Sequence, residues 1–453
     1  MNFKDKKVAV IGAGVEGSSS AAYLISKGAN VVLLDKKSEE QFGTGQIKEI
    51  RKLPIKLVLG EGYLSNLSSF DFIFRSPGIR PDLPEFLGAK KKGAVVTSQT
   101  KLFFDLCKAP IIGVTGTKGK GTTSALTHEI LKAAGKKVFL GGNIGKPPLD
   151  FVDKATADSL VVLELSSFQL MDMEKSPHIA VVLMTTCEHL DWHRDEREYV
   201  EAKERVVKFQ SEEDFLVINA DNAVSKKLGG KSKANKYYFS IVEPVNRGAY
   251  VDKDFVVSVT DGWTTITNIN DIQILGEHNL QNICAAVVVA GILETPPDIV
   301  HQAIVGFKGL PHRLESVAEK DGVKFYNDSA STAPETTIAA IHSFGSPKIL
   351  ILGGSSKGSD FTQLGREIVK SDVKAVILIG QEAKRIKGAI NTAGRFSGEF
   401  VEGLKTMQEI VEKAKNLSKP GDVVLLSPAC ASFDMFKNYP DRGDQFKEAV
   451  KLL

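Results

Sequence analysis

Short apolar runs alternate with segments of helical periodicity along almost the whole chain, and this alternation constrains the fold more than any other feature. Each run has the length of a buried strand, and the segment after it repeats its apolar residues every three or four positions. Such alternation is typical of parallel sheets that are connected and covered by helices, so we predict an α/β fold. The strands we assign are KKVAVIG, GANVVLLD and FDFIFRSPG, then APIIGVTG, KKVFLGG, SLVVLELS, HIAVVLMT and DFLVINAD, and finally VKFYND, PKILILGG, VKAVILIG and DVVLLSP.

A change in strand type and the overall length divide the chain further. A chain of 453 residues is long enough for about three domains. The first group of strands ends near residue 97, and a second boundary is expected near the segment GFKGLPHR. After about Val256 the strands become shorter and alternate in polarity, as in an antiparallel side sheet. We therefore predict domains over residues 1–97, 98–306 and 307–453.

Charge, cysteine usage and hydropathy exclude several classes of protein. The formal net charge is only +3, which creates no general attraction for polyanions, so we expect no nucleic-acid partner. The four cysteines lack CxxC or paired spacing, as in a reduced cytosolic protein. No signal peptide fits before the first glycine loop, and the longest apolar run, 283–293, is too short to span a membrane. We expect a soluble, cytoplasmic, globular protein.

The first glycine loop, GAGVEG, follows a predicted strand and precedes a predicted helix, with Asp35 at the end of the next strand. Backbone N–H groups at such a helix start suit a diphosphate, most often that of NAD or FAD. The alternative is that these glycines only let the strand and the helix approach closely. Two features argue against a dehydrogenase: the unit is short, and a second nucleotide loop follows it. A further small-residue turn, Ser76-Pro77-Gly78, lies at the same sheet edge. A different diphosphate is therefore the favoured ligand.

The second loop, TGTKGKGTT, also lies between a predicted strand and a predicted helix. Its successive N–H groups together with Lys120 suit a triphosphate, so we predict ATP binding; the alternative is a glycine-rich turn with a solvated lysine. Phosphate loops of this kind usually place Ser or Thr after the lysine to hold magnesium, but here the residue is Gly121. A hydroxyl would have to come from Thr122 or Thr123, and further oxygen ligands from elsewhere in the chain.

Two later segments contain candidate metal ligands. Glu164 is expected near the end of a buried strand, where a metal, the loop lysine or a buried salt bridge would have to offset its charge. The segment after another strand contains Glu188, His189, Asp191 and His193. This cluster has fewer histidines than zinc hydrolases do, and ATP favours magnesium. For Asp191 and His193, a structural hydrogen bond is the expected role.

These residues together resemble the Mur ligase family of ATP-dependent amide ligases over nearly the whole chain. The order and spacing of the matching segments are more specific than any one of them. The resemblance implies a Rossmann-like N-terminal domain for a UDP-sugar, a P-loop ATPase-like central domain with the antiparallel side sheet, and a Rossmann-like C-terminal domain for an amino acid. The segments are TGTKGKGTT, GGNIGKP, LELSSFQL, EHLDWH with YVEAK, GEHNLQN, GLPHRLE, NDSASTAP, LGGSSKGSDF and SPACASFDMFKNYPDRG.

Within this family the chain looks most similar to the ligases that add D-glutamate to UDP-N-acetylmuramoyl-L-alanine in peptidoglycan precursor synthesis. The resemblance implies that the carboxylate of the sugar nucleotide attacks the γ-phosphate of ATP and forms an acyl phosphate. The amine of glutamate then attacks the acyl carbon and expels phosphate. The implied cofactors are ATP and two Mg²⁺ ions, and we expect a monomer.

The resemblance also assigns roles to residues. The residues implied for catalysis are Lys120, Glu164, His189 and Lys203. The residues implied for binding the metal are Thr122, Glu164, His189 and Lys203, and Lys203 would carry a carbamate. Those for ATP are Gly116, Thr117, Lys118, Gly119, Lys120, Gly121, Thr122, Thr123, Asn279, Asn282, Arg313 and Asp328. Those for the UDP-substrate are Gly14, Val15, Glu16, Asp35, Lys36, Ser76, Pro77, Gly78, Asn143 and Ser166. Those for glutamate are Thr332, Lys357, Ser432 and Tyr439.

Some positions depart from the family pattern and leave alternatives open. Ala330 stands in NDSASTA where many members have a lysine, so an L-glutamate-adding variant is an alternative. Gly121 is shared with folylpolyglutamate synthases, although that family gives no reason for a leading GAGVEG domain. A nucleotide-regulated binding protein is a further alternative, and a dehydrogenase is one if the resemblance fails. For Lys203, the alternative is a helical lysine whose stem lies along Tyr199 and neighbouring valines and whose ammonium makes at most an exposed ion pair.

Overall fold

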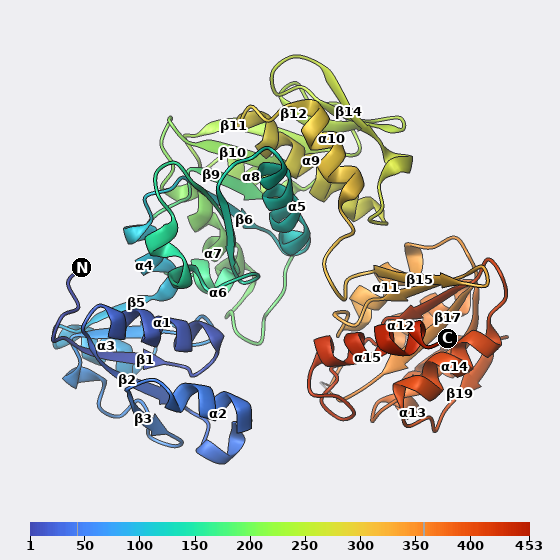
Figure 1. Ribbon diagram of the computed structural model, residues 1–453, viewed down its shortest axis with the longest axis horizontal. Helices are drawn as coiled ribbons and strands as arrows, with labels where there is room; N and C mark the ends of the chain where they lie inside the picture. Colours follow the sequence, from blue (N-terminus) through green and yellow to red (C-terminus); the bar gives the residue numbers. More distant parts are fainter. Residues whose placement is uncertain (43, 357) are drawn as a thin grey trace. The chain divides into compact units, whose positions relative to one another are not determined.

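The computed structural model describes residues 1–42, 44–356 and 358–453, which form two compact units. The first unit comprises residues 1–271 and 278–305, and the second comprises residues 272–277 and 306–453. Three sheets account for the strands, two in the first unit and one in the second (Figure 1). The predicted α/β class is confirmed. Among the residues described, no helix combines the length and apolar character that crossing a bilayer requires.

The N-terminal sheet has five parallel strands in the order β3-β2-β1-β4-β5. The three predicted strands are present, but β3 and β5 were missed because they are short and only partly apolar. Since β2, β1 and β4 are adjacent and parallel, the loops after them meet at one sheet edge. The strands are β1 (Lys7–Ile11), β2 (Asn30–Asp35), β3 (Lys56–Leu59), β4 (Phe72–Arg75) and β5 (Val95–Ser98), and the helices are α1 (Val15–Ser26), α2 (Thr44–Arg51), α3 (Pro84–Lys91) and α4 (Gln99–Leu106).

The central sheet has nine strands in the order β14-β13-β12-β11-β10-β9-β6-β8-β7. All five strands predicted for its parallel part are present, and the antiparallel pairing of β13 with β14 is confirmed as the edge of this same sheet. The strands are β6 (Ile111–Thr115), β7 (Val138–Gly142), β8 (Leu160–Glu164), β9 (Ile179–Val182), β10 (Phe215–Asn219), β11 (Asn235–Ser240), β12 (Gly248–Asp252), β13 (Phe255–Ser258) and β14 (Thr264–Asn268). The helices are α5 (Lys120–Ala133), α6 (Ser167–Leu170), α7 (Glu196–Lys208), α8 (Ala223–Gly229), α9 (Glu277–Ile292) and α10 (Pro297–Gly306).

The C-terminal sheet has six strands in the order β15-β16-β20-β17-β18-β19, and only β15 is antiparallel to its neighbour. The four predicted strands are present, and β15 and β19 were missed. The strands are β15 (Glu315–Lys320), β16 (Val323–Asn327), β17 (Lys348–Gly353), β18 (Val373–Ile379), β19 (Glu399–Val401) and β20 (Val423–Leu426). The helices are α11 (Pro334–His342), α12 (Thr362–Lys370), α13 (Ala383–Ala393), α14 (Met407–Leu417) and α15 (Tyr439–Lys451).

The hydrophobic core explains why the first two sheets belong to one unit. A single cluster of buried side chains runs from Val8 and Val10 in β1, through Phe103 in α4, to Leu163 in β8. The ring of Phe103 meets that of Phe151 edge to face at 5.6 Å. Burial of this much apolar surface on both sides holds the two sheets together.

Candidate active site

The predicted ATP-binding loop connects the end of β6 to the start of α5. Gly119 caps the helix at φ 86°, and Gly116 lies at φ 153°, where a Cβ atom would come within 2.7 Å of the Leu183 side chain. Both positions therefore require glycine. The Lys120 ammonium turns back over the loop and donates to the carbonyl oxygen of Gly116 at 3.2 Å. The loop thus places a cation beside backbone N–H groups at a helix start, an arrangement that suits phosphate.

Two residues of α9 that were predicted to contact ATP lie at this loop. The Thr123 hydroxyl donates to Oδ1 of Asn282 at 3.2 Å, and Nδ2 of Asn282 donates to Oδ1 of Asn279 at 3.0 Å. A Cβ atom on Gly119 would lie 2.1 Å from Oδ1 of Asn282, so the helix and the loop pack directly. The structure therefore brings together the loop and the asparagines, which are far apart in the sequence.

The Gly121 position lies in the first turn of α5 and contributes no side chain. Thr123 is fully buried and bonded to Asn282, whereas Thr122 is only partly buried. Of the two threonines, Thr122 is therefore the one whose hydroxyl remains accessible to a cation at the loop.

Lys203 lies in the middle of α7, a helix that begins where Asp195 accepts a hydrogen bond from the backbone of Glu198 at 2.8 Å. Lys203 is only 1% exposed, and its ammonium lies 4.7 Å from the ring centre of Tyr199 and donates to the carbonyl oxygen of Gly116 at 2.7 Å. The exposed ion pair that we considered as an alternative is therefore wrong, because the side chain enters the core at the ATP loop. Burial first, and the nearby charge of Lys120 second, hold its pKa well below the ordinary lysine value.

Glu164 ends β8, the strand beside β6, and is 4% exposed. Its Oε1 accepts a hydrogen bond from Nδ2 of Asn143 at 2.8 Å. Its Oε2 is buried and has no hydrogen-bond partner, and Glu164 makes no ion pair with any residue that the structure describes. The salt-bridge alternative is therefore wrong, and the unpartnered oxygen is chemically suited to ligate a cation.

His189 lies in the loop after β9, in the left-handed region at φ 59°. Its ring packs against Phe168 at 4.8 Å between centroids, while its side chain stays about half exposed. Burial lowers its pKa, although the charges of Glu188 and Asp191 oppose the shift, so the neutral imidazole that binds metals is favoured. No group of three or more His, Cys, Asp or Glu side chains with metal-binding geometry occurs in the described part of the chain.

The neighbouring cluster residues have structural contacts. Nε2 of His193 lies 2.9 Å from the Ser167 hydroxyl, which confirms the expected hydrogen bond, and the ring is buried. Glu188 pairs with Lys118 of the ATP loop. Asp191 is exposed, and its predicted hydrogen bond has no counterpart among the bonds of the described residues.

The predicted UDP-binding residues gather at the carboxyl edge of β2, β1 and β4. Gly12, at φ 97°, packs against Ser76 so closely that a Cβ atom would lie 2.4 Å from its hydroxyl oxygen. A Cβ atom on Gly17 would lie 1.7 Å from the carbonyl oxygen of Gly12. Asp35 accepts from the backbone N–H of Ala13 at 2.7 Å and so braces the loop. The glycines thus allow the close approach expected of a phosphate-binding turn.

The other predicted substrate residues lie near the carboxyl edge of the N-terminal sheet or near that of the central sheet. Gly14 precedes α1, Val15 is 77% exposed, and Lys36 is exposed beside Asp35. Pro77 is half-buried, and Gly78 accepts a hydrogen bond through its carbonyl oxygen. In the central sheet, Asn143 is exposed above Glu164, and Ser166 caps α6 by accepting from the backbone of Gln169 at 3.3 Å.

Glu16 differs from the other residues of the first loop because its carboxylate turns inward. Its Oε1 is buried and has no hydrogen-bond partner among the described residues. Burial raises its pKa to about 7, although the charge of Arg75 opposes the shift. Nε2 of Gln99 donates to the Glu16 carbonyl at 3.0 Å and to the Ser20 hydroxyl at 2.9 Å. The loop is therefore connected to the first residue of α4.

In the second unit, the segments after β16 and β20 meet because the two strands are parallel neighbours. Oδ2 of Asp328 accepts from the Ser427 hydroxyl at 2.7 Å, and burial raises the Asp328 pKa to about 6. Ser432 is buried in the segment after β20, and Tyr439 starts α15. Thr332 is half-buried and Arg313 is exposed, while Lys357 lies outside the described residues.

Arg442 connects these two segments, and it was not among the site residues predicted from the sequence. It is fully buried, and its Nε donates to the Ser329 hydroxyl at 2.9 Å. Its other donors reach the carbonyl oxygens of Ser329, Cys430 and Ala431 at 2.8 to 3.4 Å, and no described carboxylate pairs with it. Burial lowers its pKa to about 10. The arginine in PDRG at the start of a predicted helix was the only signal in the sequence.

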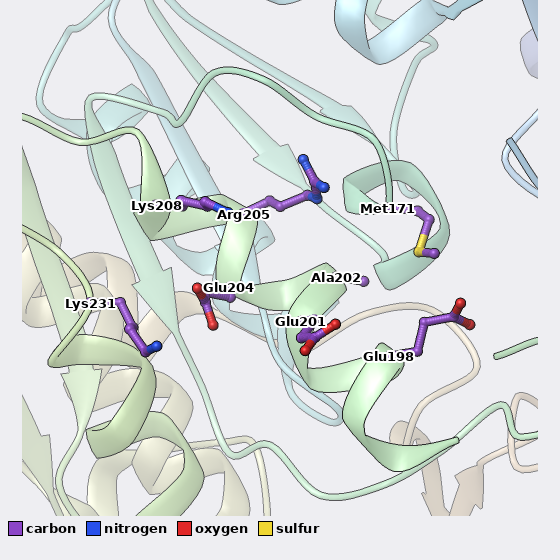
Figure 2. A pocket seen from close by; sticks show the side chains of 8 residues that line it. All are labelled: Met171, Glu198, Glu201, Ala202, Glu204, Arg205, Lys208 and Lys231. Carbon is purple, nitrogen blue, oxygen red and sulfur yellow. The ribbon is translucent and has the colours of Figure 1, made fainter. Parts of the chain in front are cut away.

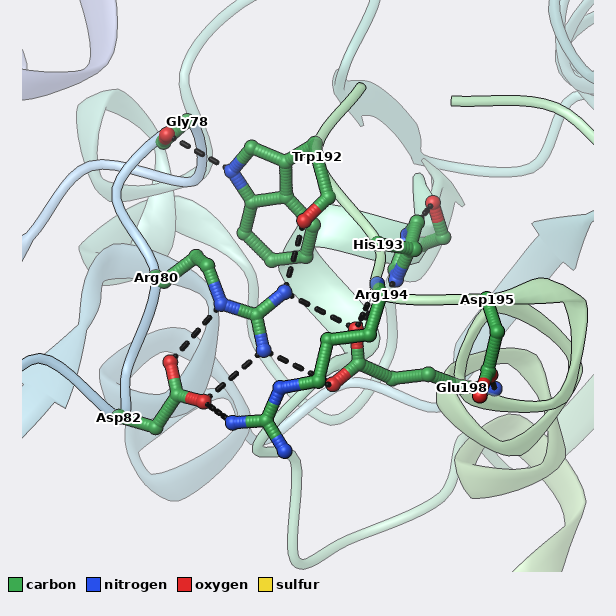
Figure 3. Close-up of polar contacts among 9 residues, drawn as sticks. Gly78, Arg80, Asp82, Trp192, His193, Arg194, Asp195 and Glu198 are labelled. Carbon is green, nitrogen blue, oxygen red and sulfur yellow. Dashed lines mark hydrogen bonds and ion pairs between the residues drawn. The ribbon is translucent and has the colours of Figure 1, made fainter. Parts of the chain in front are cut away.

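Two arginines of the first unit were also not predicted as site residues from the sequence. Arg75, fully buried at the end of β4, pairs with Asp172 beyond α6. Arg80, close behind the Ser76-Pro77-Gly78 turn, pairs with Glu198 at the start of α7 (Figure 3). A charged residue that ends an apolar strand, as in FDFIFR, is a signal that could have identified the first of them.

A hollow of about 370 Å³ lies beside α7, away from the ATP loop (Figure 2). Three glutamates and three basic side chains line it, and none of the predicted substrate or metal residues is among the lining residues. It is therefore not the candidate active site. The lining residues are Met171, Glu198, Glu201, Ala202, Glu204, Arg205, Lys208 and Lys231.

Comparison with known families gives a consistent result along the chain. Residues 6–98 match the Mur ligase MurD-like N-terminal domain, residues 114–290 match the Mur ligase middle domain, and residues 312–430 match the Mur ligase glutamate ligase domain. A UDP-N-acetylmuramoylalanine–D-glutamate ligase of Acetivibrio thermocellus is 42% identical, over 99% of this chain and 97% of its own. Another, of Symbiobacterium thermophilum, is 40% identical, over 99% of this chain and 98% of its own.

Solved structures share the fold at lower identity. UDP-N-acetylmuramate-alanine ligase MurC of Thermotoga maritima gives a TM-score of 0.63 at 19% identity, covering 99% of both chains. MurF ligase of the same organism, solved in complex with ADP, gives 0.59 at 18% identity, covering 99% of this chain and 96% of its own. These structures support the three-sheet architecture.

Proposed function

The chain belongs to the Mur ligase family, and on that premise we propose that it uses ATP to join D-glutamate to UDP-N-acetylmuramoyl-L-alanine in peptidoglycan synthesis. The geometric observation that carries the proposal is the convergence of Lys120 and Lys203 on the carbonyl oxygen of Gly116. A dehydrogenase or a simple binding module has no use for two lysines at one phosphate loop. A ligase that binds ATP and magnesium does, with Lys120 to offset phosphate charge and Lys203, once it carries a carbamate, to hold the metal.

The UDP part of the acceptor is proposed to bind at the carboxyl edge of β2, β1 and β4. Backbone N–H groups at the start of α1 would receive the diphosphate, and the bracing of this loop by Asp35 keeps them in place. Asn143 and Ser166 are proposed to hold the muramoyl-alanine arm near the ATP loop. The residues proposed for the UDP-substrate are Gly14, Val15, Glu16, Asp35, Lys36, Ser76, Pro77, Gly78, Asn143 and Ser166.

In the proposed mechanism, the loop N–H groups and Lys120 hold the phosphates while the acceptor carboxylate attacks the γ-phosphorus. The resulting acyl phosphate is then attacked by the glutamate amine. The chain contributes chiefly by positioning two anionic reactants in line and by offsetting their charge. The residues proposed for ATP are Gly116, Thr117, Lys118, Gly119, Lys120, Gly121, Thr122, Thr123, Asn279, Asn282, Arg313 and Asp328.

The residues near the loop fit magnesium. The unpartnered oxygen of Glu164, the accessible hydroxyl of Thr122 and the neutral imidazole of His189 supply three donors of suitable chemistry. When bound, the metal offsets charge on the phosphoryl group that is transferred. We propose two such ions, with Lys203 as a further ligand once it carries a carbamate. Its lowered pKa supports that modification, because the unprotonated amine is the form that reacts with CO₂.

Glutamate is proposed to bind at the carboxyl edge of β16, β20 and β17 through Thr332, Lys357, Ser432 and Tyr439. The guanidinium of Arg442 connects the segments after β16 and β20 through hydrogen bonds and places a positive charge next to them. Ala330 carries no charge where a lysine is usual, which makes the L-isomer the second candidate.

The test is phosphate release from ATP by the purified protein with UDP-N-acetylmuramoyl-L-alanine and either D- or L-glutamate, with folate and NAD as controls. We expect release that depends on both substrates and on the D-isomer. Preference for the L-isomer would establish the variant ligase. Phosphate release that does not depend on glutamate would contradict the ligase activity and favour a nucleotide-regulated binding protein.

Three broader proposals accompany this function. We propose a UDP-sugar domain over residues 1–97, an ATP domain over residues 98–306 and an amino-acid domain over residues 307–453. We also propose that the protein acts as a monomer, which light scattering on the purified protein can test. We place it in the cytoplasm, where ATP and the sugar nucleotide would be available.

A further inference from the structure

Arg80 uses every donor of its guanidinium in a junction between the N-terminal and central sheets (Figure 3). Nε and Nη2 donate to the two oxygens of Asp82, both at 2.9 Å. Nη1 and Nη2 donate to the two oxygens of Glu198 at 2.9 and 2.8 Å, and Nη1 also donates to the carbonyl oxygen of Trp192 at 2.7 Å. An arginine has five N–H donors in a planar fork, and this geometry occupies all of them.

The junction connects the turn Ser76-Pro77-Gly78, called the UDP loop from here on, with the loop that follows β9. Arg80 lies two residues after Gly78, the end of the small-residue turn at the carboxyl edge of β4. The indole Nε1 of Trp192 donates to the carbonyl oxygen of Gly78 at 2.8 Å, and the Arg80 guanidinium lies 5.1 Å from the indole ring centre. Two independent contacts thus hold the same two loops together.

From this junction the packing continues to the candidate metal ligand. The Trp192 ring packs against Phe168 at 4.8 Å, and Phe168 packs against His189 at 4.8 Å. Movement of Trp192 would therefore be transmitted to His189 through the Phe168 ring, because close-packed side chains cannot shift independently.

The junction also fixes the start of the helix that carries Lys203. Glu198 lies in the first turn of α7 and accepts from the backbone N–H of Arg194 at 2.8 Å. Its side chain is 14% exposed, and its pKa is lowered to about 2, chiefly through its hydrogen bonds with Arg80. The pair therefore stays ionised at neutral pH and is more shielded from water than an ordinary surface ion pair.

We propose that Arg80 is a positioning residue that couples the UDP loop to the loop of His189 and to the helix of Lys203. The identity of the two coupled sites, a UDP site and a metal site, rests on the proposed function. The proposal states that occupancy of the UDP loop alters the environment of Trp192 through Arg80, and that catalysis depends on this connection.

The chain offers a direct probe, because it has only two tryptophans, Trp192 and Trp263. Trp263 is 61% exposed, so Trp263→Phe leaves Trp192 as the single reporter. In this background we expect saturation with uridine diphosphate to change Trp192 emission, and Arg80→Ala to abolish the change. We expect the same substitution to lower kcat by about 10²-fold, with little change in the KM for ATP, since misplacement by about 1 Å has that cost.

Two further variants keep the test valid if Arg80→Ala folds poorly. Arg80→Lys keeps the charge but loses the fork, and Glu198→Gln keeps the shape but loses the charge, so both should give intermediate losses in kcat and emission response. Arg197→Ala is the matched control, because Arg197 is 83% exposed and its ion pair among the described residues is with Glu201 on the same helix. It should leave both readouts unchanged.

A lowered melting temperature with normal kcat and a normal Trp192 response in these variants would overturn the proposal, because the junction would then only hold the sheets together. If the unmodified protein proved inactive as a ligase while Arg80→Ala still abolished the Trp192 response, the proposed function would fail and the coupling would stand.

Discussion

Lys120 and Lys203 donate to the same carbonyl oxygen, that of Gly116, at 3.2 and 2.7 Å. One lysine comes from the phosphate loop and the other from the middle of α7, so two helices place their cations at one point of the loop. Two ammonium groups this close repel each other, and Lys203 is the more buried of the two. Burial, and after it the charge of Lys120, holds the pKa of Lys203 well below the ordinary lysine value, which makes Lys203 the candidate for carbamate formation.

Replacing Lys203 should test that role. Lys203→Ala is expected to lower kcat by at least about 10²-fold, because a metal site would lose an anionic ligand. Acetate or formate should partly restore phosphate release by filling the gap. Lys203→Arg should not be rescued, since the guanidinium stays charged and fills the space. Lys208→Ala, at the exposed end of the same helix, is the control. Near-normal turnover of Lys203→Ala at saturating magnesium would exclude the carbamate.

Lys120→Ala should separate the two nucleotide sites. Turnover of ATP is expected to be lost, while calorimetry should show nearly unchanged affinity for the UDP-substrate, because the first loop lies on a different sheet. Loss of UDP-substrate affinity together with turnover would contradict the assignment of the two loops to different ligands.

Glu164→Gln should show how much the unpartnered carboxylate oxygen lowers the free energy of unfolding of the metal-free protein. In metal-free protein the substitution is expected to raise the free energy of unfolding by about 1–3 kcal/mol, because an uncompensated buried charge is removed. Magnesium should raise the melting temperature of the unmodified protein, reversibly on addition of EDTA, but not that of the variant. Glu129→Gln, at a half-exposed position on α5, should leave the magnesium effect intact. An equal magnesium effect in both variants would show that Glu164 is not a ligand.

Glu16 should make the stability of the first unit depend on pH. Its pKa in the folded protein is about 7, above the 4.5 of an ordinary glutamate, so the folded state binds more protons between these values. Its contribution is fully present below about pH 4 and is lost as the pH rises through 7. Compared with Glu16→Gln, the unmodified protein should lose at most about 3 kcal/mol between pH 4 and 8 in urea unfolding. Parallel pH curves for the two proteins would refute this.

Arg442→Met should destabilise the second unit, because the buried carbonyl oxygens of Ser329 and Cys430 would lose the donors that Arg442 supplies. The expected loss is about 3 kcal/mol or more in the free energy of unfolding, with a smaller loss for Arg442→Lys. The KM for glutamate should rise in both variants, since the segments containing Ser329 and Cys430 lose their common partner. Arg395→Met, at an exposed position, is the control. An unchanged KM would show that Arg442 only stabilises the fold.

The fold class, the main parallel strands, the two glycine loops and the helix after each loop could be predicted from the sequence. These features depend on neighbouring residues, because hydrophobic periodicity and turn chemistry act over a few positions. The positions of Lys120 at the start of a helix and of Glu164 at the end of a strand followed from the same local patterns. Short strands such as β3, β5 and β19 could not be predicted, since three or four residues carry too weak a pattern.

Only the tertiary structure decided which distant groups meet. Lys203 and Gly116 are 87 residues apart, Arg80 and Glu198 are 118 apart, and Arg442 and Ser329 are 113 apart. The first and third of these contacts exist because crossover connections place non-consecutive strands side by side, as in the order β9-β6-β8, so that segments from separate parts of the chain meet at one sheet. The second exists because two different sheets pack into one unit. Local propensity carries no information about that order. Burial, which changes the pKa of Lys203 and Glu16, arises only when the sheets and helices have packed.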